Sequence, residues 1–91
     1  MGRIIELPCE IGDNVYEIIV DTIGKEISLD CYTVQDVSIK AIKYCDEWKD
    51  RSELGIRIFL NEDIAEQAFE SMKMLSEYKN YVFYRDYDNM K

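Results

Sequence analysis

The chain contains no histidine among its 91 residues, only one proline and four glycines, and no long run of apolar side chains. Without an imidazole there is no Ser–His or Cys–His nucleophile and no histidine general base. Apolar runs this short exclude a membrane-spanning helix and predict that no signal peptide is present. Among nineteen carboxylates, some pairs have the spacing of a catalytic pair by chance alone, so such pairs do not indicate an acid–base site. We therefore expect a protein that is not an enzyme.

Cysteine is also sparse, and the spacing of the three cysteines argues against a zinc site. Cys9, Cys31 and Cys45 lie far apart in the chain, whereas zinc sites use short spacings such as Cys-x-x-Cys. An odd number of cysteines also does not suit a disulfide framework. We expect free thiols in a reducing cytoplasm, no metal and no cofactor, with Cys31 and Cys45 buried as small apolar side chains.

Basic residues are also few. Eleven Lys and Arg stand against nineteen Asp and Glu, which gives a net charge of -8. Direct binding to nucleic acid or to an anionic membrane surface needs a basic patch, and the sequence has none. The negative charge either keeps a small domain soluble or attracts a partner with a basic surface.

The length suits a single domain over residues 1–91, with mainly strands over 1–60. Asn61 is a good N-cap, and apolar residues at helical spacing predict one long helix over 61–80. Its stripe of Phe69, Met72 and Leu75 should pack against Phe59. An aromatic tail at 81–91 follows, as a strand or as more helix. Strands are predicted by β-branched content and turn residues at 15–20, 26–29, 32–44 and 55–60. The polar segment 45–53 is predicted as a loop or a single helical turn.

These elements predict an α+β domain. We expect a small curled antiparallel sheet, similar to an SH3-like barrel, with the one long helix near the C-terminus.

One candidate binding surface is the acidic face of the predicted helix. Glu62, Glu66 and Glu70 recur every four residues and so share one face, and Asp63 joins them in the first turn. The row is either a solvated surface or an imitation of the phosphates of a duplex, aimed at a basic nucleic-acid channel. A second acidic stretch covers residues 6–36, and the sequence does not say whether it shares a face with the helix.

The aromatic tail is the other candidate surface. Tyr81, Tyr84 and Tyr87 follow the predicted helix closely, and tyrosine gives a large contact area at low entropic cost. The alternative is that Tyr81 and Phe83 cap the open end of the sheet, while Tyr84 and Tyr87 fray into solvent. A stacking platform for single-stranded nucleic acid would need more cations than Arg85.

Two segments resemble small phage and prophage proteins from Gram-positive bacteria. Residues 7–16, LPCEIGDNVY, resemble their opening, in which Leu-Pro-Cys and a variable residue precede Val/Ile-Gly-Asp and then Val-Tyr. Residues 54–68 are similar to their strand-to-helix junction, in which Gly leads into a Val-Phe-Leu strand and a Thr-capped helix. Asn61 replaces that Thr, and Ile64 stands where the family tends to have an acidic capping-box residue. The resemblance implies a phage setting and names no activity.

Together these features predict a phage-encoded, non-enzymatic protein that acts in the cytoplasm of the host. It would bind the basic surface of a host nucleic-acid-handling or defence factor, such as a CRISPR effector, by nucleic-acid mimicry. Two alternatives stay open. One is a protein that sequesters a nucleotide or another small molecule, although such a pocket should contain convergent Lys or Arg. The other is an accessory phage protein that forms homo-oligomers through its aromatic tail.

Overall fold

The computed structural model describes residues 7–86 of the chain and belongs to the α+β class, as predicted. One α-helix and seven strands are present in this part of the chain. In order, the elements are β1 (Asn14–Asp21), β2 (Glu26–Thr33), β3 (Asp36–Val37), β4 (Ala41–Tyr44), β5 (Glu47–Asp50), the 3-10 helix η1 (Arg51–Glu53), β6 (Ile58–Phe59), α1 (Glu62–Met72), the 3-10 helix η2 (Ser76–Tyr78) and β7 (Val82–Arg85).

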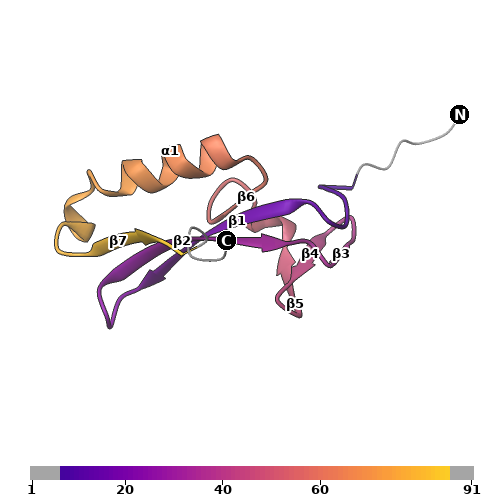
Figure 1. Ribbon diagram of the computed structural model, residues 1–91, viewed down its shortest axis with the longest axis horizontal. Helices are drawn as coiled ribbons and strands as arrows, with labels where there is room; N and C mark the ends of the chain where they lie inside the picture. The colour runs from indigo at the N-terminus through magenta and orange to yellow at the C-terminus, as the bar shows by residue number, and fades with distance from the viewer. Residues whose placement is uncertain (1–6, 87–91) are drawn as a thin grey trace, which may run out of the picture.

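The strands form two open sheets (Figure 1). The larger sheet has the order β6-β1-β2-β7, and its centre is the antiparallel hairpin of β1 and β2. The smaller sheet has the order β3-β4-β5. β7 runs parallel to β2 because α1 carries the chain across the sheet from β6, and such crossovers join parallel strands. The larger sheet is thus mixed, whereas an antiparallel sheet was predicted, and no barrel-like closure is seen in the described residues.

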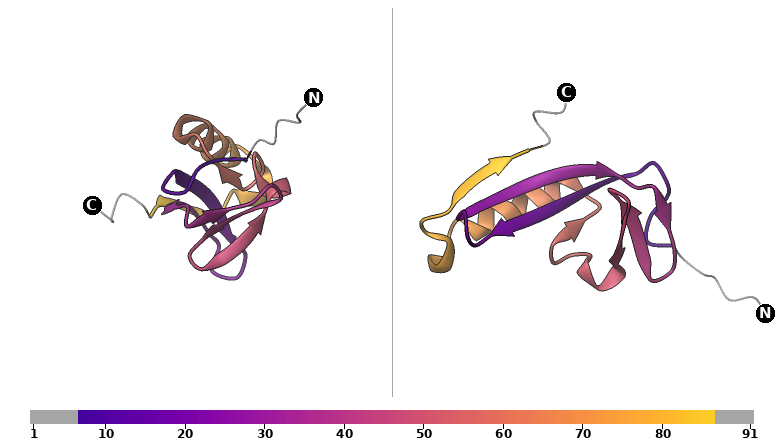
Figure 2. Two further views of the ribbon diagram at one scale, coloured as in Figure 1. Left: turned by 90° about the vertical axis from the view of Figure 1, so that its right-hand side faces the viewer. Right: turned by 90° about the horizontal axis from the view of Figure 1, so that it is seen from below.

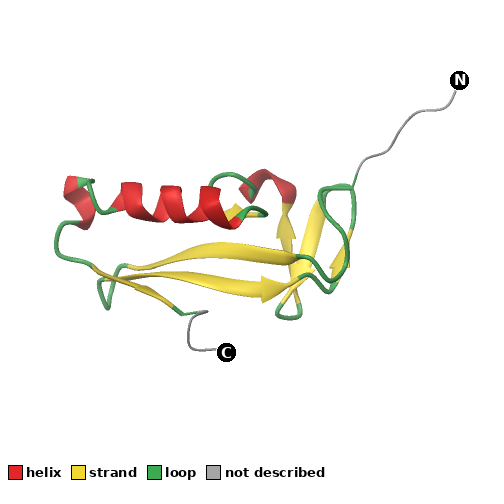
Figure 3. Ribbon diagram, turned by 45° about the horizontal axis from the view of Figure 1, so that its top comes forward, coloured by secondary structure: helices red, strands yellow, loops and turns green. Residues whose placement is uncertain are grey.

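Helix α1 covers one face of the larger sheet (Figure 3). Side chains alternate across a strand, so every second residue of β1 and β2 points towards the helix. These residues form the main core with Phe59 and with two buried residues of α1, Ala65 and Phe69. The smaller sheet packs at the end of the larger sheet around a second core. That core consists of Val15, Val34, Ile42, Tyr44 and Ile58.

The helix begins as predicted and ends earlier. The Asn61 side chain caps it, with Oδ1 accepting from the Ile64 N–H at 3.0 Å. The helix ends at Met72, whereas the sequence predicted helix over 61–80. Beyond Met72 the backbone N–H groups donate to carbonyls three residues back, which tightens the chain into a turn. This turn leaves Leu75 exposed, so its predicted burial with Phe69 and Phe59 is wrong, while Met72 packs on the core.

The predicted strand over 32–44 is broken into parts. The Ser38 hydroxyl accepts from the N–H groups of Lys40 and Ala41, which forms a tight turn between β3 and β4. The predicted strand over 55–60 shrinks to the two residues of β6. Segment 45–53, predicted as a loop or a single helical turn, contains the short 3-10 helix η1 and also the strand β5, which was not predicted. Cys45 and Asp46 have φ of 52° and 60° and make the two-residue turn between β4 and β5. Cys45 is therefore exposed, which corrects the prediction that it is buried.

The described segments contain no helix with the length and hydrophobicity that crossing a lipid bilayer requires.

Candidate functional site

The face of the larger sheet that points away from α1 gathers acidic and apolar side chains. In the right-hand view of Figure 2, α1 lies behind the β1–β2 hairpin, so this face is turned to the reader. Its residues alternate with those of the main core along β1, β2 and β7. We define the open face as Glu17, Ile19, Asp21, Glu26, Ser28, Asp30, Val82 and Tyr84.

The strand register arranges the carboxylates of the open face in two pairs. Glu17 lies directly opposite Asp30, and Asp21 lies directly opposite Glu26. Between the pairs, Ser28 is flanked by Ile19 on β1 and by Tyr84 on β7. Like charges directly opposite each other in a sheet are destabilising, and no Lys or Arg belongs to the open face. The acidic stretch at 6–36 therefore places four of its carboxylates on one surface, and not on the side that α1 covers.

Apolar side chains accompany these carboxylates. Val82 is 63% exposed and Tyr84 is 41% exposed on β7, and Ile19 is exposed on β1, on the other side of Ser28. A binding surface uses exposed apolar side chains such as the neighbouring Val82 and Tyr84 for contact area. The sequence carried a signal for this face, because the acids of each strand are four residues apart and therefore lie on the same side of that strand.

Asp30 differs from the other carboxylates because it is only 8% exposed. Its Oδ2 accepts a hydrogen bond from the Tyr32 hydroxyl at 2.9 Å. Its Oδ1 is buried and has no hydrogen-bond partner within residues 7–86. Buried acceptors are nearly always paired, so this unpaired oxygen calls for an explanation.

The smaller sheet meets the open face through a pair of tyrosines. The Tyr44 ring stacks on the Tyr32 ring with 5.1 Å between their centroids, and the Tyr44 hydroxyl donates to Glu17 Oε1 at 2.8 Å. Beside them is a pocket of about 200 Å³ between the two sheets. Its lining consists of Glu17, Ile19, Tyr32, Tyr44, Cys45, Glu47 and Lys49.

The tyrosines and the cysteine of this pocket stay protonated at neutral pH. Burial, followed by the hydrogen bond to Asp30, raises the pKa of Tyr32, and burial with the hydrogen bond to Glu17 does the same for Tyr44. Burial and the neighbouring carboxylates also raise the pKa of the Cys45 thiol. A nucleophilic cysteine needs a lowered pKa, so nothing here favours thiolate chemistry.

The predicted row of helix acids is paired with cations of the chain itself. Arg85 Nε donates to Glu66 Oε2 at 2.7 Å, and its Nη2 donates to Glu70 Oε2 at 2.8 Å. Lys73 Nζ lies 3.0 Å from the same Glu70 oxygen. Hydrogen bonds from Lys73 and then Arg85 lower the pKa of Glu70, and the bond to Glu66 contributes most to raising the pKa of Arg85. Two of the four predicted acids are thus drawn to Arg85.

The other two acids, Glu62 and Asp63, are exposed in the first turn of α1. Two of the predicted tyrosines lie on opposite faces of the larger sheet, because side chains alternate between the faces along this part of the chain. Tyr81 packs against the main core and makes an edge-to-face contact with Tyr78 at 5.2 Å, whereas Tyr84 lies on the open face. Tyr87 lies outside the described residues. The structure therefore does not gather the predicted residues on one surface.

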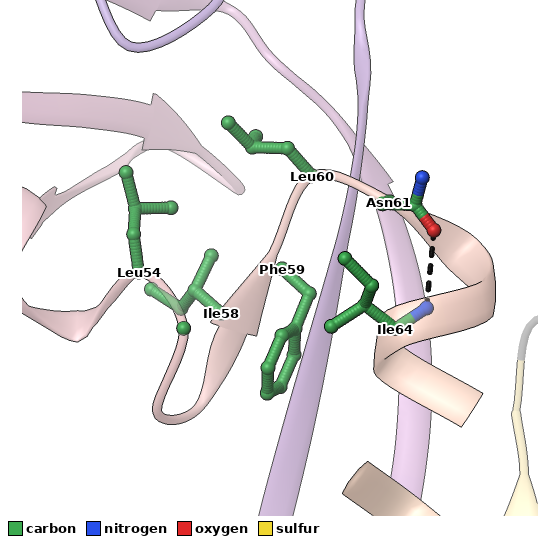
Figure 4. Close-up of a pocket in the computed structure, with 7 residues that line it drawn as sticks. Leu54, Ile58, Phe59, Leu60, Asn61 and Ile64 are labelled. Atoms are coloured by element: carbon green, nitrogen blue, oxygen red, sulfur yellow. Dashed lines mark hydrogen bonds between the residues drawn. The ribbon is translucent and has the colours of Figure 1, made fainter. Parts of the chain in front are cut away.

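Two further pockets lie near the start of α1. One, of about 330 Å³, is lined mainly by apolar side chains, among them Leu60 and Ile64 (Figure 4). The other, of about 480 Å³, lies at Pro8 and Cys9. Neither is lined by a Lys or Arg. In the described part of the chain no group of three or more His, Cys, Asp or Glu side chains could hold a metal, and all three thiols are free.

Comparison of the chain with protein-family models, curated protein sequences and solved structures finds no match.

Proposed function

We propose that this chain is a non-enzymatic inhibitor that binds the basic surface of a host nucleic-acid-handling or defence factor, such as a CRISPR effector, in the bacterial cytoplasm. The open face carries the proposal, because it opposes Glu17 to Asp30 and Asp21 to Glu26 and contains no Lys or Arg of its own; the nearby Lys49 belongs to β5 of the smaller sheet. A surface with Lys and Arg would relieve this repulsion on binding. The resemblance of residues 7–16 and 54–68 to phage and prophage proteins supports a phage setting.

The open face supports this role better than the helix row does. Glu66 and Glu70 already bind Arg85, so a partner cation would have to displace an existing ion pair. The two carboxylate pairs of the open face are about 13 Å apart along the strands, at 3.2–3.4 Å per residue. They can engage separate cations of a groove that normally contacts phosphates. Tyr84, level with Ser28 between the pairs, and Val82, beside Glu26, supply apolar contact.

Nucleotide sequestration receives no comparable support. A pocket for a phosphate group should contain convergent cations. Lys49 is the one cation in the lining of the pocket between the sheets, and it shares this lining with the carboxylates of Glu17 and Glu47.

The test uses two double variants with equal changes in net charge. Glu26→Lys with Asp86→Lys, the open-face variant, reverses an acid of the open face and the exposed acid that directly follows β7. Asp63→Lys with Glu77→Lys, the control variant, reverses exposed acids of α1 and η2. Labelled duplex DNA is bound to purified CRISPR effectors and nucleases, and its displacement by the protein is followed by fluorescence anisotropy.

We expect the wild type to displace DNA from at least one factor and to lose potency with added salt, because exposed charges are screened. The open-face variant should lose about tenfold or more in potency, which corresponds to about 1.4 kcal/mol. The control variant should stay within about twofold of the wild type. Equal losses in both variants, or no displacement from any factor, would contradict the proposal.

A further inference from the structure

The pocket between the two sheets has the size of a site for one side chain. Its volume of about 200 Å³ is below the roughly 300–1,000 Å³ of pockets that enclose whole small molecules. Glu17 and Ile19 of the larger sheet form one side, and Glu47 and Lys49 of β5 form another. Tyr32 and Tyr44 join the two sheets at its wall. The pocket is continuous with the open face, because Glu17 and Ile19 belong to both.

Hydrogen-bond acceptors dominate this pocket and its surroundings. Glu17 uses one oxygen for the Tyr44 hydroxyl, and Glu47 is exposed at the turn end of β5. Asp30, opposite Glu17 and bonded to the Tyr32 wall, keeps one buried oxygen without a partner in the described residues. Asp30 does not line the pocket, so a ligand there would be held by Glu17 and Glu47. The remaining acceptor positions of these two carboxylates suit a group that brings several donors and positive charge.

The tyrosine wall also attracts cations. Lys49 Nζ lies 5.7 Å from the centroid of the Tyr44 ring, within the range of a cation–π interaction. The chain thus already holds an ammonium group at this ring. A compact ammonium offers three donors at one point, whereas a guanidinium presents five donors in a plane that stacks on aromatic faces and forks onto carboxylates.

We propose, resting on the function proposed above, that this pocket receives the guanidinium of an arginine side chain from the basic surface of the partner. Glu17 and Glu47 accept its N–H groups, and the partly exposed Tyr32 side chain supplies contact area beside them. The arginine would then anchor the partner at the end of the open face, where two sheets enclose it on more than one side. Anchors of this kind, buried in a pocket, contribute disproportionately to binding at protein interfaces.

The test titrates the full chain with four small probes and follows the ring and backbone signals of Tyr32, Tyr44 and Lys49 by NMR. The probes are N-acetylarginine amide, N-acetyllysine amide, N-acetylcitrulline amide and spermidine. Citrulline has the shape of arginine without its charge, and spermidine is a free polyamine with no guanidinium. We expect saturable shifts with the arginine probe, at least about threefold weaker binding of the lysine probe, and none with the citrulline probe.

Variants locate the binding site. Glu17→Gln retains an oxygen acceptor for the Tyr44 hydroxyl, and Glu47→Gln alters an exposed side chain, so the second variant remains informative if the first unfolds. Each should weaken binding of the arginine probe about fivefold or more. The matched control, Asp63→Asn, should leave it unchanged.

Three results would overturn the assignment. They are equal binding of the arginine and citrulline probes, unchanged binding in Glu47→Gln, and tighter binding of spermidine than of the arginine probe at these residues. The last result would identify a polyamine site. Failure of DNA displacement with intact arginine binding would reject the proposed function alone, and the reverse combination would reject this pocket alone.

Discussion

Removal of the Phe69 ring should destabilise the domain severely. Phe69 belongs to α1 and is fully buried in the main core. Its ring meets the Phe83 ring edge-to-face with 5.5 Å between the centroids, and the Arg85 guanidinium lies 5.1 Å from the centroid of the Phe69 ring. Phe→Ala in a core costs about 3–5 kcal/mol, and the aromatic pair accounts for about 0.5–1.5 kcal/mol of that loss. The total stability of a chain of this length is about 5–14 kcal/mol. Phe69→Ala should therefore remove a large share of it.

Urea unfolding and calorimetry measure this loss. At about 4–8 °C per kcal/mol for a domain of this size, the melting temperature should fall by at least about 12 °C. The matched control is Ile64→Ala, in the same helix with an exposed side chain, which should cost less than about 1 kcal/mol. Equal losses for the two variants would refute the conclusion that α1 holds the sheet through Phe69.

Two further predictions follow from the tyrosines and from β7. Because the native pKa values of Tyr32 and Tyr44 are raised, only the unfolded state ionises them near pH 10. The urea midpoint should thus be steady below that pH and fall above it, and it should fall less in Tyr44→Phe; an equal fall would contradict the assignment. Deletion of the residues after Asn80 removes β7 with Phe83, so circular dichroism should show loss of the fold. A deletion variant that melts like the wild type would show that β7 is dispensable.

Local signals predicted the parts of the fold that depend on neighbouring residues. Asn61 and the apolar residues after it predict a capped helix, and the β-branched run at 15–20 predicts a strand. The end of the helix depends on how far the sheet extends beneath it, which is a tertiary property. The turn at Cys45 and Asp46 places two non-glycine residues at positive φ, and the usual Asn-Gly or Asp-Gly signal of such a turn is absent.

The candidate site could be predicted only in part from the sequence, because its charge pairing also depends on tertiary contacts. Spacing places Glu66 and Glu70 on one helix face, but their pairing with Arg85 depends on β7 returning beside β2. Likewise, spacing places Glu17 and Asp21 on one side of a strand. Only the register of β1 with β2 shows that each of them faces another carboxylate.

This register yields a last prediction about the cost of the open face. Glu26 lies directly opposite Asp21, so neutralising it should relieve repulsion between the strands. Asp21 itself is left unchanged because its Oδ1 accepts from the N–H groups of Ile23 and Gly24 in the hairpin turn. Glu26→Gln should therefore raise the stability of the fold by a few tenths to about 1 kcal/mol, while it weakens displacement of DNA.

Salt distinguishes this relief from an unrelated gain in stability. The screening length is about 30 Å at 0.01 M salt and about 3 Å at 1 M, so the advantage of Glu26→Gln in urea melts should be largest at low salt and vanish at high salt. Asp63→Asn is the control, because a carboxylate in the first turn of α1 is stabilised by the helix dipole and its loss should bring no gain. If Glu26→Gln melts like the wild type at low salt, the opposed carboxylates carry no repulsion. The open face would then give no reason to infer a cationic partner.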